Sequence, residues 1–176
     1  MKTKLIYGLL LAAAGFLFTL VLFIFGLESD PAKIGLSDAI RGIGMLVVAS
    51  VIIALGIRAA RAKWPAAESF TYGGAFAVGA GITAVASLLA IATHTFYVCA
   101  VNPQYTEFLI QSRLNILEAH DISGDQFDRA EKMTRIVCGV TGQAVSACIR
   151  VAVSGLIISL IAAAFLRRPA APPKLA

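Results

Sequence analysis

The chain has 176 residues, of which 59% are hydrophobic and 14% are charged, with a formal net charge of +5. A soluble domain has about 45–50% apolar and about 25% charged residues. This composition excludes an ordinary soluble enzyme, a disordered chain and a disulfide-rich secreted domain. It indicates a helical membrane protein, in which the net positive charge is no sign of nucleic-acid binding.

Four apolar runs approach or exceed the roughly 20 residues that a helix needs to cross the hydrocarbon core of a bilayer. They cover about residues 6–27, 40–57, 75–101 and 137–166. Backbone groups cannot reach water in lipid, so each run is predicted as a helix. We therefore expect an all-α fold, a four-transmembrane-helix bundle that forms a single integral membrane domain over residues 1–168. A Pro/Ala-rich, disordered tail is expected over residues 169–176.

Lysine and arginine are distributed unequally between the two sides that these spans define. With the N-terminus inside, the cytoplasmic side holds one acid, Glu68, and eight basic residues: Lys2, Lys4, Arg58, Arg61, Lys63, Arg167, Arg168 and Lys174. The other side holds nine acids and six basic residues. The positive-inside rule therefore predicts a multi-pass protein of the bacterial inner membrane with both termini cytoplasmic. The first span is expected to stay uncleaved, because its apolar run continues past the alanines at 12–14 that could serve as a signal-peptide site.

Residues 102–135 are predicted to form a helical extracytoplasmic loop of two amphipathic pieces between the third and fourth spans. The second piece begins at Ser123–Gln126, which has the spacing of a capping box. Since no helix breaker precedes the fourth span, we expect this piece and that span to form one long helix. The loop is interpreted either as a partner-binding cap or as a lid on the bilayer or on its own bundle. Its acids lack the spacing of a calcium loop, so no metal site is predicted.

Small residues recur every four positions in two of the spans. They are Ala75, Gly79, Thr83 and Ser87 in the third, and Gly155, Ser159 and Ala163 in the fourth. Lipid tails are as apolar as leucine, so helices in a membrane associate through close packing of small residues. We expect these two stripes to form tight helix contacts, with a pore lining as the other interpretation.

Four polar residues within the spans are the candidate site residues: Arg41, His94, Gln143 and Arg150. Their distances along the helices place them in one outer-leaflet layer that is cationic and has no acid inside the membrane. We interpret this layer as a candidate site for an anionic lipid headgroup, over which Asp38 or Glu107 could fold. In the alternative interpretation, Arg150 snorkels to a loop acid and His94 is a hydrogen-bonded packing residue.

The three cysteines are too few for a disulfide framework. Cys99 and Cys138 flank the predicted loop, so they could form a disulfide on the oxidising side of the membrane. Free buried thiols are the alternative, and Cys148, roughly 15 Å deeper, is expected to stay free. No nucleophile beside a base is evident and no cofactor motif occurs, so we expect no enzymatic activity and no cofactor.

Four segments together carry a resemblance to a known family: Lys4–Gly8, Phe70–Gly79, Val101–Glu107 and Ser154–Arg168. They resemble the bacterial four-helix membrane family catalogued as domain of unknown function 4199. The resemblance covers most of the chain and implies a small inner-membrane protein. It implies no catalytic residues, because the family has no established activity.

These observations predict a small inner-membrane protein that acts as a non-catalytic accessory or interaction subunit through its loop and its lipid-facing helices. The expected partners are membrane lipids and either another protein or further copies of this chain, without nucleic acid. One alternative is a carrier or channel for a small solute, formed by an oligomer. Another is a lipid-binding or lipid-modifying protein that uses the outer-leaflet layer.

Overall fold

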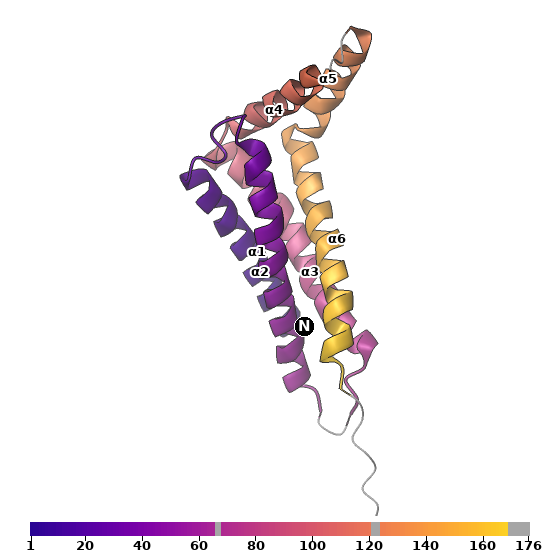
Figure 1. The fold of residues 1–176 in the computed structure, drawn as a ribbon. Coiled ribbons are helices and arrows are strands. Elements are labelled where there is room, and N and C mark those ends of the chain that lie inside the picture. Colours follow the sequence, from indigo (N-terminus) through magenta and orange to yellow (C-terminus); the bar gives the residue numbers. More distant parts are fainter. Residues whose placement is uncertain (66–67, 121–123, 169–176) are drawn as a thin grey trace, which may run out of the picture. The chain divides into compact units, whose positions relative to one another are not determined.

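The computed structural model describes residues 1–65, 68–120 and 124–168. Within these ranges the chain is helical and has no strand, apart from an isolated bridge between Phe70 and Arg168. The elements in chain order are α1 (Lys2–Ile24), α2 (Ile34–Ala62), α3 (Tyr72–Phe96), the π-helix η1 (Tyr97–Val101), α4 (Tyr105–Ala119), α5 (Asp125–Val137) and α6 (Val140–Leu166) (Figure 1). The predicted all-α class is confirmed. The predicted tail over residues 169–176 and Ser123 of the predicted capping box lie outside the described residues.

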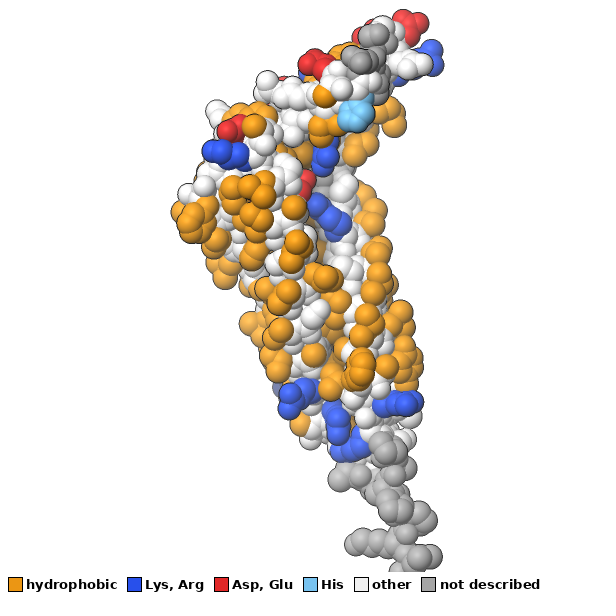
Figure 2. Space-filling view, viewed as in Figure 1, with side chains coloured by type: hydrophobic (Ala, Val, Ile, Leu, Met, Phe, Trp, Pro, Cys, Tyr) orange, Lys and Arg blue, Asp and Glu red, His pale blue; other side chains and the backbone are white. Residues whose placement is uncertain are grey.

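Four helical segments are long and apolar enough to cross a membrane: α1, α2, α3 together with η1, and α6. Their outer surfaces carry many exposed large hydrophobic side chains, which Figure 2 shows in orange. Exposed apolar surface of this extent marks contact with a membrane or with other proteins. Helices that are long and apolar enough to be membrane spans therefore occur at the four predicted positions, and they indicate a multi-pass membrane protein. The helix α2 begins at Ile34 and extends beyond both predicted ends of the second span.

The chain folds as two compact units, each of which includes a part of every long helix. The first unit comprises Met1–Ala14, Leu46–Leu89 and Ile149–Ala176, and the second comprises Gly15–Met45 and Ala90–Cys148. The single membrane domain over residues 1–168 stays a prediction, and we describe the two units separately.

The first unit is held together by close approach of α3 and α6. A Cβ atom at Gly79 would lie 2.6 Å from Oγ of Ser159, and one at Gly155 would lie 2.5 Å from Cγ2 of Thr83. Thr83, Ser159 and Ala163 are each at most 1% exposed. The two predicted stripes of small residues are therefore confirmed as the contact between these helices, and their burial supports packing rather than a pore lining.

The second unit has an aromatic core. Ile34, Tyr97, Val98 and Tyr105 are buried together, with the partly buried Phe23 and other apolar side chains packed around them. The rings of Tyr97 and Tyr105 lie 5.6 Å apart in an edge-to-face arrangement, a geometry that aromatic pairs prefer. Because Tyr105 is the first residue of α4, this core fixes the start of α4 against the end of the third span.

The helices α5 and α6 are separate, so the expected single long helix is wrong. The chain leaves the helical path at Cys138 and Gly139, where the side-chain nitrogen of Gln143 donates a hydrogen bond to the Cys138 carbonyl at 2.5 Å. A Cβ atom at Gly142 would collide with the carbonyl oxygen of Val137. The bend is therefore possible because Gly142 has no side chain and Gln143 satisfies the carbonyl that the bend exposes.

Candidate functional site

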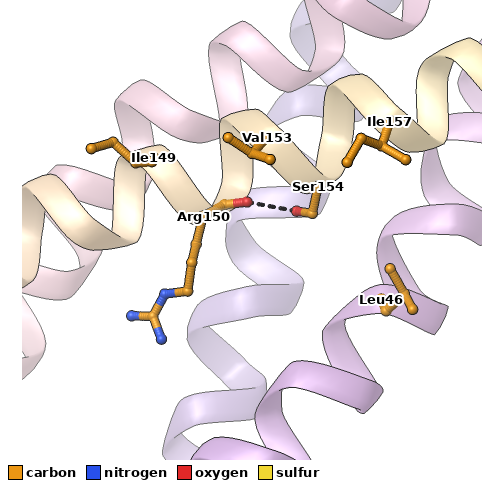
Figure 3. A pocket seen from close by; sticks show the side chains of 6 residues that line it. All are labelled: Leu46, Ile149, Arg150, Val153, Ser154 and Ile157. Atoms are coloured by element: carbon orange, nitrogen blue, oxygen red, sulfur yellow. Dashed lines mark hydrogen bonds between the residues drawn. The ribbon is translucent and has the colours of Figure 1, made fainter.

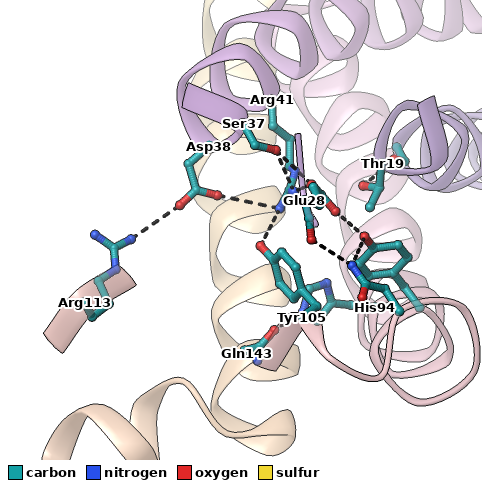
Figure 4. Close-up of polar contacts among 12 residues, drawn as sticks. Thr19, Glu28, Ser37, Asp38, Arg41, His94, Tyr105, Arg113 and Gln143 are labelled. Carbon is teal, nitrogen blue, oxygen red and sulfur yellow. Dashed lines mark hydrogen bonds and ion pairs between the residues drawn. The ribbon is translucent and has the colours of Figure 1, made fainter. Parts of the chain in front are cut away.

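A buried carboxylate lies at the centre of a polar cluster in the second unit (Figure 4). Glu28, in the connection between α1 and α2, is 0% exposed. One of its oxygens accepts a hydrogen bond from Oγ of Ser37 at 3.0 Å and forms an ion pair with Arg41, and the other accepts one from the hydroxyl of Tyr97. A buried carboxylate is tolerated only when it is paired and hydrogen-bonded, and this one is both.

The π-helix η1 supplies two of the groups that surround Glu28. Its wider turn brings the N–H of Asn102 to the carbonyl of Tyr97, where it donates a hydrogen bond at 2.9 Å. The side-chain nitrogen of Asn102 donates to the backbone oxygen of Glu28 at 3.0 Å and to the Tyr97 hydroxyl at 3.1 Å. The end of the third span is thus tied to the connection between α1 and α2. Single π turns are frequent at functional positions in helices.

Arg41 extends the cluster from Glu28 toward α4. It lies 3.7 Å from a carboxylate oxygen of Asp38, and its guanidinium donates a hydrogen bond to the Tyr105 hydroxyl at 3.4 Å. Asp38 in turn lies 3.4 Å from Arg113 of α4. Two carboxylates therefore face two guanidinium groups, and this part of the cluster carries no net charge.

His94 belongs to a second set of hydrogen bonds in the same unit. Its Nε2 lies 3.0 Å from Oε1 of Gln143, which identifies Nε2–H as the donor because an amide oxygen only accepts. The amide nitrogen of Gln143 donates to Oγ1 of Thr106 at 3.0 Å and to the carbonyl of Cys138. His94 and Gln143 thus connect the third span to α4 and to the bend before α6.

The structure brings three of the four predicted site residues into this unit, and it places Arg150 in the first unit. The expectation that no acid enters the layer is wrong, because Glu28 folds inward to pair with Arg41. Glu107 does not cover the layer, since it lies at an exposed position 4.0 Å from Arg135. An anionic-lipid site that uses all four residues stays a prediction.

Glu28 and Asn102 are site residues that the sequence did not point to. Glu28 directly follows an apolar run, where an acid ordinarily marks the water-exposed end of a span. The spacing of Tyr97 and Asn102 matches no α-helical face, because it corresponds to the five-residue repeat of a π turn. Two features of the sequence could have indicated this cluster. One is the presence of tyrosines near the end of a span, and the other is an acid with an arginine close by in the next span.

All three cysteines are free thiols in the structure, with Cys99 exposed, Cys138 buried and Cys148 intermediate. The Cys99–Cys138 disulfide is therefore not formed here and stays a prediction. Burial raises the pKa of the Cys138 thiol, which precedes the fourth span. The raised pKa disfavours the thiolate, which is the nucleophilic form of cysteine.

The family model described as "Protein of unknown function (DUF4199)" matches residues 6–168. The chain belongs to this family, and the resemblance seen in the sequence is confirmed. No curated protein and no solved structure matches the chain.

Among the described residues, no group of three or more His, Cys, Asp or Glu side chains could hold a metal ion. Glu28 and Arg41 contact one another and neighbouring side chains. The cluster therefore stabilises the fold of the second unit.

Proposed function

We propose that this protein is a non-catalytic interaction subunit of a membrane complex and that it presents helix α5 to a protein partner at the membrane surface. The proposal is supported chiefly by one observation, which is that α5 has no buried residue. A helix that contributes nothing to the core of its own chain is available for contacts with another. The unknown-function family and the apolar helices are consistent with this role.

Helix α4, which precedes α5, is anchored to the rest of the second unit. Helix α5 is therefore held in a defined position although it has no buried residue of its own. In α4, Tyr105 is 2% exposed and Ile110 is 5% exposed, and Arg113 pairs with Asp38 of α2. Helices α4 and α5 pack against each other. The chain thus holds one side of a helical hairpin and leaves the other side open.

The open side of α5 combines apolar and basic side chains. Met133 is 59% exposed and Ile136 is 61% exposed, and Arg129 and Lys132 are exposed on the same helix. Protein interfaces are enriched in methionine and arginine around an apolar centre, and exposed apolar patches rimmed by polar residues mark interaction sites. This composition supports a protein partner.

A photo-crosslinking amino acid at Met133 is expected to give one discrete protein adduct in native membranes. The same amino acid at Ile161, an exposed apolar position of α6, serves as the matched control and is expected to give lipid adducts. The adduct partner should also co-purify with the full chain in a fixed ratio, and Ile136→Glu should abolish that co-purification. Because Ile136 is exposed, this variant should keep the melting temperature of the original protein within about 2 °C.

Three results would contradict the proposal. Lipid adducts alone at Met133 would mean that α5 lies on the bilayer as a lid. Substrate-dependent flux through the purified chain in liposomes, without any partner, would support the carrier or channel instead. A partner whose ratio is unchanged by Ile136→Glu would bind elsewhere on the chain.

The proposal includes an orientation, with both termini in the cytoplasm of a bacterium and α5 outside the inner membrane. The unequal distribution of lysine and arginine supports it. In a chain whose cysteines are replaced by alanine, Gln126→Cys should react with a membrane-impermeant maleimide on intact cells. Lys63→Cys, in the segment between α2 and α3, should react only after the membrane is opened. Both positions are exposed, and the reverse labelling pattern would show that the orientation is inverted.

A further inference from the structure

A shallow apolar groove lies in the first unit between α2 and α6 (Figure 3). Its volume is about 440 Å³, and it is lined by Leu46 of α2 and by Ile149, Arg150, Val153, Ser154 and Ile157 of α6. The volume falls within the range of ligand pockets, roughly 300–1,000 Å³. All lining residues belong to helices that are long and apolar enough to cross a membrane. The groove therefore faces the acyl chains of the bilayer.

Arg150 borders this groove, and its side chain has no polar partner among the described residues. Within the part of the chain that the structure describes, its guanidinium forms no hydrogen bond and no ion pair, and only its backbone carbonyl is engaged, by Ser154 at 2.7 Å. Arg41, at the edge of the second predicted span, has Glu28 as its counter-ion. The two arginines thus differ in whether the protein itself supplies the anion.

Arg150 lies far from both ends of α6, so the lack of a counter-ion from the protein matters for its charge. It lies ten residues after Val140 and 16 before Leu166, so roughly 15 Å and roughly 24 Å of helix separate it from the two ends. Ile149, Val153 and Ile157 surround it with apolar surface. A guanidinium at such a depth is retained only where an anion or water reaches it, because arginine stays charged.

We propose that Arg150 and the α2–α6 groove form a binding site for an acidic phospholipid. The lipid phosphate binds the guanidinium, and an acyl chain lies in the groove along α6 toward Ile157. A guanidinium fork matches the oxygens of a phosphate in a bidentate arrangement. Figure 3 shows the guanidinium displaced to the side of the groove away from Ile157, which separates a charged end from an apolar end.

The side chains between Arg150 and Ile157 are suited to bind an acyl chain next to a charged headgroup. The distance from Arg150 to Ile157 is seven residues, or roughly 10 Å of helix, and the side chains between them on the groove are apolar except Ser154. The Ser154 hydroxyl is already satisfied by the backbone of its own helix. It therefore adds no polar requirement to the surface that the acyl chain contacts. The site involves no residue of α5 and is independent of the proposed interaction role.

The test uses the purified full chain and counts bound lipid by native mass spectrometry after equilibration with vesicles of equal parts phosphatidylglycerol and phosphatidylcholine. The original protein is expected to retain about tenfold more phosphatidylglycerol than phosphatidylcholine. Arg150→Leu should lose this preference, and Arg150→Lys should keep part of it. Val153→Trp should fill the groove and lower retention although Arg150 is present. Arg129→Leu, which removes an exposed arginine from α5, is the matched control and should retain lipid normally.

Melting temperatures of all variants report folding, and the exposed positions of Arg150, Val153 and Arg129 leave little structure to lose. Equal retention of the two lipids by the original protein would overturn the proposal. So would an undiminished preference in folded Arg150→Leu, or an equal loss in Arg129→Leu, since either would show that general positive charge attracts the lipid. If Arg150→Leu does not fold, Val153→Trp and Arg150→Lys decide: full retention in both would overturn the site.

Discussion

Replacing Glu28 with glutamine is expected to lower the free energy of unfolding by about 3–5 kcal/mol, because it removes one partner of a buried ion pair and leaves Arg41 with only the carboxylate of Asp38, 3.7 Å away. Glu28 is 0% exposed, and the Arg41 side chain is 13% exposed. Glutamine has nearly the same shape, but its single carbonyl oxygen accepts a hydrogen bond from only one of Ser37 and Tyr97, which donate to different oxygens of Glu28. The loss therefore reports the missing negative charge together with one rearranged hydrogen bond. Equilibrium unfolding in mixed detergent micelles measures it.

Two further variants separate the ion pair from a general effect of losing an acid. Glu118 is exposed near the end of α4, so Glu118→Gln should change the free energy of unfolding by at most about 0.5 kcal/mol. Replacing Glu28 and Arg41 together with methionine should recover most of the loss, because a buried ion pair can often be exchanged for apolar side chains at little cost. An unfolding free energy for Glu28→Gln equal to that of the original protein would contradict the role assigned to the pair.

Gly155→Ala is expected to cost about 1–3 kcal/mol of unfolding free energy, since inserting atoms into a closely packed contact forces the backbone to move. The added Cβ would lie 2.5 Å from Cγ2 and 2.6 Å from Oγ1 of Thr83. Thr83 is 1% exposed and branched at Cβ, so rotating its side chain places another heavy atom in the same space. The helices α3 and α6 must therefore separate at this point.

The matched control is Gly73 of α3, where an added Cβ meets nothing within 4 Å. Gly73→Ala should be neutral or stabilise the helix by up to about 1 kcal/mol, because alanine has the higher helix propensity. Thr83→Ala should rescue Gly155→Ala, and the double-mutant cycle should show a coupling energy of about 0.5–3 kcal/mol. Equal effects of alanine at Gly155 and at Gly73 would refute close packing of α3 and α6.

Two levels of this structure were predictable because their signals are local. A bilayer requires a long apolar run for each crossing, and that run is readable in the sequence whatever its neighbours are. The four spans were therefore found, although the extra turns of α2 at both ends were not. The stripe of small residues from Ala75 to Ser87 is also a local pattern, since the helical repeat places residues four apart on one face. Its contact with Gly155 and Ser159 followed from the shared requirement for close approach.

What the tertiary structure decided was which polar groups meet. By its position alone Glu28 resembles an acid at the wet end of a span, and it becomes a buried counter-ion only because the chain between α1 and α2 turns back toward Arg41. Two further polar contacts likewise join residues distant in sequence. Tyr97 meets Glu28 from 69 positions away, and Gln143 lies 49 positions from His94. Apolar length is a property of one segment, whereas satisfying a buried charge or carbonyl depends on atoms from several. The sequence alone therefore determined four helices long and apolar enough to cross a membrane. Their packing determined that, among the residues the structure describes, Arg41 has a counter-ion in the protein and Arg150 has none.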